Sequence, residues 1–133
     1  MFVALFKTIN HQNTMKKLFS LVALFVGMHF ALHAQNIKPD DAANHLGETV
    51  TVCGKIFGGK FFDKSEMTLL NMGAAFPKSP LTIVIAKDDR KNFKTAPEEF
   101  YSDKNVCITG VVKEYKGKPQ IFIKSEDDIK IEQ

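Results

Sequence analysis

The chain has 133 residues, of which 44% are hydrophobic and 25% are charged; 18 Lys and Arg face 15 Asp and Glu, so the formal net charge is +3. This length fits one domain and excludes a multidomain enzyme. The charge is distributed unevenly, because residues 1–34 contain three lysines but no acidic residue. The N-terminal third therefore has to be interpreted before the total charge.

An export signal is predicted at the N-terminus. Lys16 and Lys17 follow Met15 and precede an apolar run that ends at the small residue Ala34, which is typical of a secretory signal peptide. Its uninterrupted part, residues 18–26, is far shorter than the roughly 20 residues that a membrane-spanning helix needs. We expect cleavage after Ala34, which leaves no stable membrane span, and export to the periplasm or the medium. The alternative is an uncleaved signal anchor.

The predicted division is an N-terminal extension and signal peptide over 1–34, followed by one domain over 35–133. Removal of 1–34 takes away Lys7, Lys16 and Lys17, which leaves 15 basic and 15 acidic residues. The net charge of the predicted domain is then zero. Overall attraction to nucleic acid is therefore excluded, and only a local group of lysines could support such binding.

Five short β-strands are predicted after residue 48, because apolar and β-branched residues alternate or cluster between turn residues. The last two are joined by Lys116, Gly117 and Lys118, with Pro119 at a strand start, where a missing N–H is tolerated. Five short strands in fewer than ninety residues predict a small barrel. The expected strands are 50–56, 67–72, 81–86, 106–112 and 120–124.

Two helical pieces are expected beside these strands. Pro39 and two following acidic residues favour a short helix over 39–46, which ends at Gly47. A second helical region is expected between strands three and four, over 88–93 and 97–101, with Phe93, Phe100 and Tyr101 as its core contacts. The class is mainly β, with the element order β-β-β-α-β-β.

Several segments resemble small exported bacterial OB-fold domains that are grouped with nucleic-acid-binding, tRNA-anticodon-binding-like modules. The resemblance covers nearly all of 35–133, and its motifs mark turns and barrel corners. It implies a five-stranded Greek-key barrel whose two loops, after strand one and before strand five, bind oligonucleotides or sugars. The segments are V-T-V-C-G-K-I at 50–56, L-L-N-M-G at 69–73, P-L-T-I-V-I at 80–85, D-R-K-N-F at 89–93, N-V-C-I-T-G at 105–110 and Y-K-G-K-P-Q-I at 115–121.

The two cysteines, Cys53 and Cys107, fall on the same face of their strands as neighbouring threonines. The OB resemblance implies that strands one and four are neighbours, so the two thiols could lie within bridging distance. An exported protein meets an oxidising compartment, where such a bridge persists. Two free thiols are the alternative, because sequence alone does not set strand register.

Lysines and aromatic residues alternate in two segments that the resemblance places near each other, 57–64 and 115–118. Aromatic rings stack on bases and lysines neutralise phosphates, so this composition suits weak binding of a single strand. The alternative is that the rings belong to the core and that the lysines are solvated turn residues. The candidate nucleic-acid-binding residues are Phe57, Lys60, Phe61, Lys64, Tyr115, Lys116 and Lys118.

Residues for catalysis are few. His45 is the only imidazole in 35–133, and two Cys with one His fall short of a four-ligand zinc site. No phosphate-binding loop or nucleophile elbow occurs. We therefore expect no enzyme activity, no cofactor and no metal. The expected function is an exported OB-fold module that binds single-stranded nucleic acid weakly; the alternative is a cell-envelope module that binds a protein or a small ligand.

Overall fold

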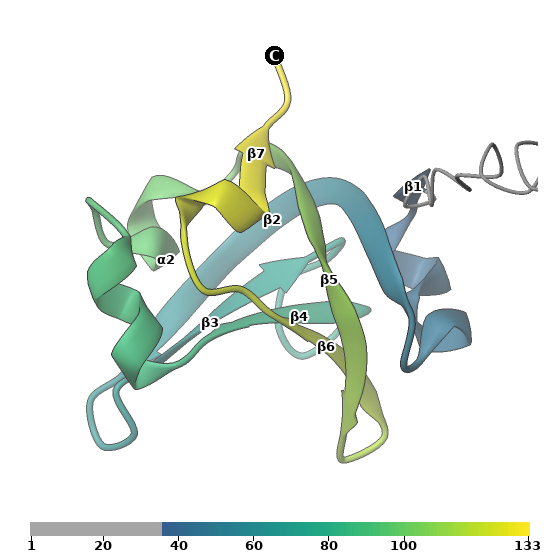
Figure 1. Cartoon of the computed structure of the whole chain (residues 1–133), viewed down its shortest axis with the longest axis horizontal. Helices are drawn as coiled ribbons and strands as arrows, with labels where there is room; N and C mark the ends of the chain where they lie inside the picture. Colours follow the sequence, from purple (N-terminus) through teal and green to yellow (C-terminus); the bar gives the residue numbers. More distant parts are fainter. Residues whose placement is uncertain (1–35) are drawn as a thin grey trace, which may run out of the picture. The chain divides into compact units, whose positions relative to one another are not determined.

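A computed structural model describes residues 36–133 (Figure 1). The predicted extension and signal peptide at 1–34 lie outside the described residues. Within 36–133, no helix has the length and apolar character needed to span a membrane. The elements are β1 (Asn36–Ile37), η1 (Pro39–His45), β2 (Thr49–Phe62), β3 (Met67–Met72), β4 (Leu81–Ile85), η2 (Lys87–Asn92), α2 (Pro97–Phe100), β5 (Asn105–Tyr115), β6 (Lys118–Phe122), η3 (Glu126–Asp128) and β7 (Ile129–Ile131).

The sheet has seven strands, so the prediction of five was wrong in number. The five predicted strands correspond to β2, β3, β4, β5 and β6. The additional strands are short: β1 pairs in parallel with β2, and β7 pairs antiparallel with β5. Two or three residues are too few to show a periodic pattern, which is why the sequence did not reveal them.

The five longer strands close a ring of pairings and give the fold an OB-like topology. β2 pairs with both β3 and β5, β3 pairs with β4, and β6 lies between β4 and β5. All of these pairs are antiparallel except β4 with β6. Figure 1 shows β2 as one long curved strand that passes both partners.

β2 is longer than predicted, and this corrects the position of the first binding segment. The predicted strand ended at Ile56, but β2 continues to Phe62, with an irregular register between Ile56 and Gly59. Gly58 has a φ of 89°, a backbone conformation that favours glycine. β2 pairs with β5 up to Lys55 and with β3 from Ile56, so this irregularity lies near the start of the pairing with β3. Residues 57–62 are therefore strand, and the turn covers only 63–66.

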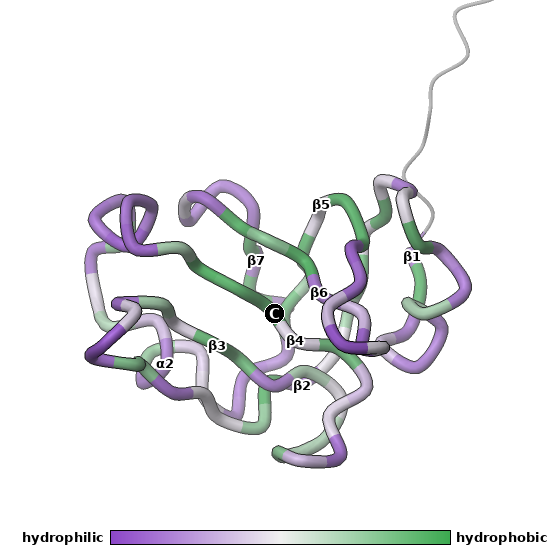
Figure 2. The backbone as a smooth tube through the Cα atoms, turned by 90° about the horizontal axis from the view of Figure 1, so that it is seen from below, coloured by the Kyte–Doolittle hydropathy of each residue, from purple (hydrophilic) through white to green (hydrophobic). Residues whose placement is uncertain are grey.

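The core lies inside the ring and is built from alternate residues of its strands. Leu70 of β3 stands opposite Ile83 of β4, and Val112 of β5 stands opposite Ile121 of β6. All four have no exposed surface. Side chains of successive strand residues point to opposite faces, so the intervening residues face outward. Figure 2 shows apolar residues along the strands and hydrophilic residues at the turns.

The helical pieces appear where the sequence predicted them, mostly as short 3-10 turns. η1 covers the first predicted helix, and Pro39 packs so closely on β2 that a Cβ at Gly54 would lie 2.6 Å from its Cγ. η2 and α2 fill the connection between β4 and β5. Phe93 and Tyr101 are buried as expected, whereas Phe100 is 40% exposed, so its assignment to the core was wrong.

Cys53 of β2 and Cys107 of β5 are direct register partners, and their sulfur atoms form a disulfide. Both side chains are half-buried. On the same face, the next pair along, Thr51 and Thr109, is joined by a 2.8 Å hydrogen bond between the two hydroxyl groups. The register between β2 and β5 thus decides the question that the sequence left open.

Candidate ligand-binding groove

The outer face of β3 forms the floor of a groove. Met67, Leu69 and Asn71 point outward because they alternate with the buried residues of the same strand. In register, Leu69 stands between Lys60 of β2 and Val84 of β4. Val84 is fully buried and lines neither hollow, so Met67 and Leu69 supply the apolar part of the floor.

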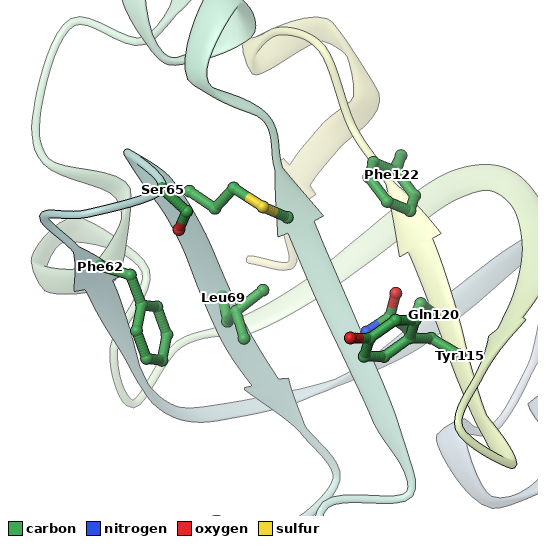
Figure 3. Close-up of a pocket in the computed structure, with 7 residues that line it drawn as sticks. Phe62, Ser65, Leu69, Tyr115, Gln120 and Phe122 are labelled. Carbon is green, nitrogen blue, oxygen red and sulfur yellow. The ribbon is translucent and has the colours of Figure 1, made fainter.

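Two hollows share this floor. The first has a volume of about 350 Å³ and lies between Phe62 on one side and Tyr115, Gln120 and Phe122 on the other (Figure 3). The second, of about 440 Å³, extends along β2 toward Phe76. Phe62 and Leu69 line both hollows, so we treat them as one site. This β3 groove is lined by Gly59, Lys60, Phe62, Ser65, Met67, Leu69, Asn71, Phe76, Tyr115, Gln120 and Phe122.

Four aromatic rings along the groove are open to solvent. Phe76 is 78% exposed, Tyr115 is 57% exposed, Phe62 is 39% exposed and Phe122 is 38% exposed. They come from three connections or strand ends that are distant in the sequence: the end of β2, the loop between β3 and β4, and the hairpin of β5 and β6. The closed ring of strands brings them to one face.

Three of these rings each lie near a lysine ammonium. The Nζ atom of Lys60 is 5.1 Å from the centroid of Phe62, and the Nζ atom of Lys116 is 5.3 Å from the centroid of Tyr115. These distances are within the range of a cation–π contact. The third pair is Lys113 with Phe122, also at 5.3 Å.

The residues that line the groove include no carboxylate. Asp63 and Glu114 lie in the adjoining turn and strand but do not line either hollow. Glu66, at the end of the same turn, forms an ion pair with Lys87, and this contact raises the pKa of the lysine above its ordinary value. The local charge at the groove is therefore positive although the domain is neutral overall.

Lys118 connects the two loops at one end of the groove. Its ammonium donates a 3.2 Å hydrogen bond to the backbone oxygen of Pro77. This contact joins the hairpin of β5 and β6 to the loop that carries Phe76. Lys118 therefore lies where the sequence placed it, near the groove, but its ammonium already has a protein partner.

Of the other candidate residues, four lie at or beside the groove and two do not. Lys60 and Tyr115 line the groove, and Lys116 lies beside Tyr115. Lys64 is exposed in the turn 63–66, next to Ser65, which lines the first hollow.

Phe57 and Phe61 do not line the groove. Phe57 precedes the register shift of β2 and lies 5.1 Å from the ammonium of Lys55. Phe61 stands opposite the buried Thr68, and the guanidinium of Arg90 lies 4.2 Å from its ring centroid. Its side chain is therefore on the opposite face from Phe62.

Sequence reasoning missed Phe62, Phe122 and Gln120 as groove residues. The alternation of side chains along β6 could have indicated two of them. Gln120 and Phe122 alternate with the buried Ile121 and Ile123, so their side chains face outward. Outward-facing apolar residues on neighbouring strands indicate a binding face, but only the register shows which of them meet.

A polar cluster behind the groove anchors α2. Both guanidinium nitrogens Nη1 and Nη2 of Arg90 donate to the carboxylate of Glu98, at 2.8 and 2.9 Å, and Nη1 also contacts the hydroxyl of Thr68. The hydrogen bonds from Arg90 lower the pKa of Glu98, and the same pair raises the pKa of Arg90. Burial raises the pKa of Tyr101 nearby. These groups hold the scaffold and do not face the groove.

The described residues bring one group of potential metal ligands together, Cys53, Cys107 and Glu132. The two sulfur atoms belong to the disulfide, so they are not thiolates and cannot act as strong ligands. We assign no metal to this group.

No protein-family model and no curated protein matches this sequence. Solved structures of similar fold include a chain assigned as an aspartyl-tRNA synthetase from Leishmania major Friedlin, with 10% identity over 87% of this chain and 26% of that chain and a TM-score of 0.50. Asparaginyl-tRNA synthetase from Pyrococcus horikoshii has 13% identity over 73% of this chain and 23% of that chain, with a TM-score of 0.49. Aspartyl-tRNA synthetase from Entamoeba histolytica has 14% identity over 77% of this chain and 22% of that chain, with a TM-score of 0.49.

This chain spans about a quarter of the length of each of these structures. At such low identity the likeness shows the fold alone. It fits the resemblance to tRNA-anticodon-binding-like OB modules that the sequence motifs carry.

Proposed function

We propose that this protein binds single-stranded nucleic acid in the β3 groove. The observation that supports the proposal is the set of three lysine–ring pairs around an apolar hollow that no carboxylate lines. The proposal assigns binding, not catalysis.

The rings supply the sequence-independent part of the interaction. Each exposed ring offers a face on which a nucleobase can stack, at about 1–3 kcal/mol per base. A base in a duplex is already stacked and paired, so the groove favours an unpaired strand. The apolar floor at Met67 and Leu69 provides a surface that such bases can cover.

The lysines supply the contacts with the backbone of the ligand. Lys60, Lys113 and Lys116 each extend from the rim beside a ring, so a base on the ring places its phosphate near an ammonium. Neutral overall charge limits long-range attraction. We therefore expect weak affinity that depends on salt through about three phosphate contacts.

We also propose that the protein works in an oxidising compartment, the periplasm or the medium. The disulfide between Cys53 and Cys107 supports this, because such bonds are rare in reducing compartments. The signal peptide predicted from the sequence agrees with it.

The test is fluorescence anisotropy with the purified full chain, fluorescein-labelled dT12 and a labelled 12-base-pair duplex. We expect dT12 to bind more tightly than the duplex. A plot of log affinity against log salt should have a slope of about −2, which corresponds to three contacts at about 0.7 each on a single strand. Tyr115→Ala should weaken binding about fivefold or more without changing this slope, because it removes stacking and no charge.

The double variant Lys60→Glu with Lys116→Glu should lose tenfold or more in affinity for dT12 at low salt. Its matched control is Lys94→Glu with Lys130→Glu, which makes the same change in net charge at exposed lysines that do not line the β3 groove. Equal losses in the two double variants would show that only net charge matters. The absence of binding to any single strand would favour the cell-envelope protein or small-ligand module instead.

A further inference from the structure

Gln120 contributes an amide side chain to the lining of the first hollow. It lies on the outer face of β6, in register between Thr82 of β4 and Lys113 of β5. Figure 3 shows it beside Tyr115 and across β3 and β4 from Phe62. The side chain is half-buried, and its amide takes part in none of the side-chain hydrogen bonds among residues 36–133. No polar side-chain atom in this range is buried without a partner, so the amide is open to the solvent of the hollow.

An unengaged amide in an apolar hollow is suited to recognising the edge of a base. Its carbonyl accepts and its NH₂ donates, side by side in one plane, which matches the N6 donor and N7 acceptor of adenine. The other side chains at the first hollow are mostly apolar or aromatic, with Ser65 and the hydroxyl of Tyr115 at the rim. Recognition of a base edge in this hollow therefore depends mainly on Gln120.

The surroundings of Gln120 favour adenine over the other bases. One amide satisfies both polar groups on an edge of adenine, whereas the pairing edges of guanine and cytosine each carry a third polar group. That third group would lie against the mostly apolar lining, and a buried polar group without a partner costs about 1–3 kcal/mol. Thymine and uracil can also pair with an amide, but a purine has a larger surface to stack between Phe62, Tyr115 and Phe122. The hollow thus distinguishes bases by the hydrogen-bonding groups on their edges and by the size of their rings.

We propose that Gln120 makes the β3 groove selective for adenine. This inference rests on the proposed binding of single strands and adds the base that the groove prefers. Gln120 acts as a specificity-determining residue, and the rings and lysines provide affinity that is common to all sequences.

The test uses the full chain and fluorescein-labelled hexanucleotides dT3-X-dT2, in which X is A, C, G or T. The wild type should bind the X = A strand about fivefold more tightly than the X = T strand, the lower end expected for one bidentate amide contact. Gln120→Leu should abolish this preference, so that the X = A and X = T strands bind with affinities within twofold of each other. Gln133→Leu, at an exposed glutamine outside the groove, should retain the preference.

Gln120→Glu provides a positive test that a structural role cannot imitate. A carboxylate accepts but does not donate, so the preferred base should change from adenine to guanine, whose N1–H and N2 amino group both donate to it. Equal wild-type affinity for all four strands, or an adenine preference that persists in Gln120→Leu, would overturn the inference and leave the proposed function intact. A failure of every strand to bind would overturn both.

Discussion

Removal of the disulfide should destabilise the fold by about 4 kcal/mol. Cys53 and Cys107 are separated by 54 positions, and the chain-entropy relation gives about 14 cal/mol/K for a closed loop of that size, or about 4 kcal/mol at 25 °C. The perturbation is Cys53→Ser with Cys107→Ser, and the assay is equilibrium unfolding in urea. The midpoint of thermal unfolding should fall by roughly 15 °C or more.

The adjacent pair on the same face supplies the control. Thr51→Ala with Thr109→Ala removes the 2.8 Å hydroxyl hydrogen bond between the same two strands but no covalent bond. We expect it to cost about 1 kcal/mol. If the serine variant loses no more free energy of unfolding than this alanine variant, the loop-closure argument is refuted, and the strand pairing alone stabilises the ring.

Two further predictions concern the scaffold of the groove. Glu98→Gln should reduce the free energy of unfolding by about 2 kcal/mol at pH 7, because the charged hydrogen bonds to Arg90 are weakened. The pKa of Glu98 is lowered by folding, so the advantage of the wild type should be complete above the ordinary value of 4.5 and should disappear as the pH falls through the lower pKa of the folded state. Urea unfolding at pH 7 and pH 3 measures the difference in free energy of unfolding between the wild type and the variant. The same difference at both pH values would contradict a stabilising ion pair. Gly59→Ala should cost about 1–3 kcal/mol, because the new Cβ would lie 2.6 Å from the backbone oxygen of Leu69; a variant with wild-type urea stability would show that β2 can move away from β3.

The class of fold followed from the sequence because strand patterns are local. Alternation and turn residues identified β2 to β6 and the helical connection between β4 and β5. β1 and β7 were missed because they owe their pairing to neighbouring strands and not to their own composition. The continuation of β2 beyond Ile56 was missed for a related reason: glycines interrupt the pattern, but backbone pairing with β3 extends the strand through them.

Lys60, Lys116 and Tyr115 could be selected by composition, since they lie in turns or near strand ends where side chains are exposed. Lys113, within β5, was not selected. The aromatic residues of β2 could not be assigned to the groove from composition. Phe61 and Phe62 are adjacent and chemically identical, yet one lies under Arg90 and the other lines the groove. A single step along a strand reverses the face, so the register with β3 decides which ring is available to a ligand.

The sequence by itself determined that this domain is mainly β, that its two cysteines share one face of their strands, and that lysines and rings concentrate in two segments. Only the tertiary structure decided that the cysteines are opposite each other, and that Phe62, Phe76, Tyr115 and Phe122 surround one apolar floor. The reason is physical: periodicity sets the face of each side chain within its own strand, whereas the closure of the ring sets which strands become neighbours.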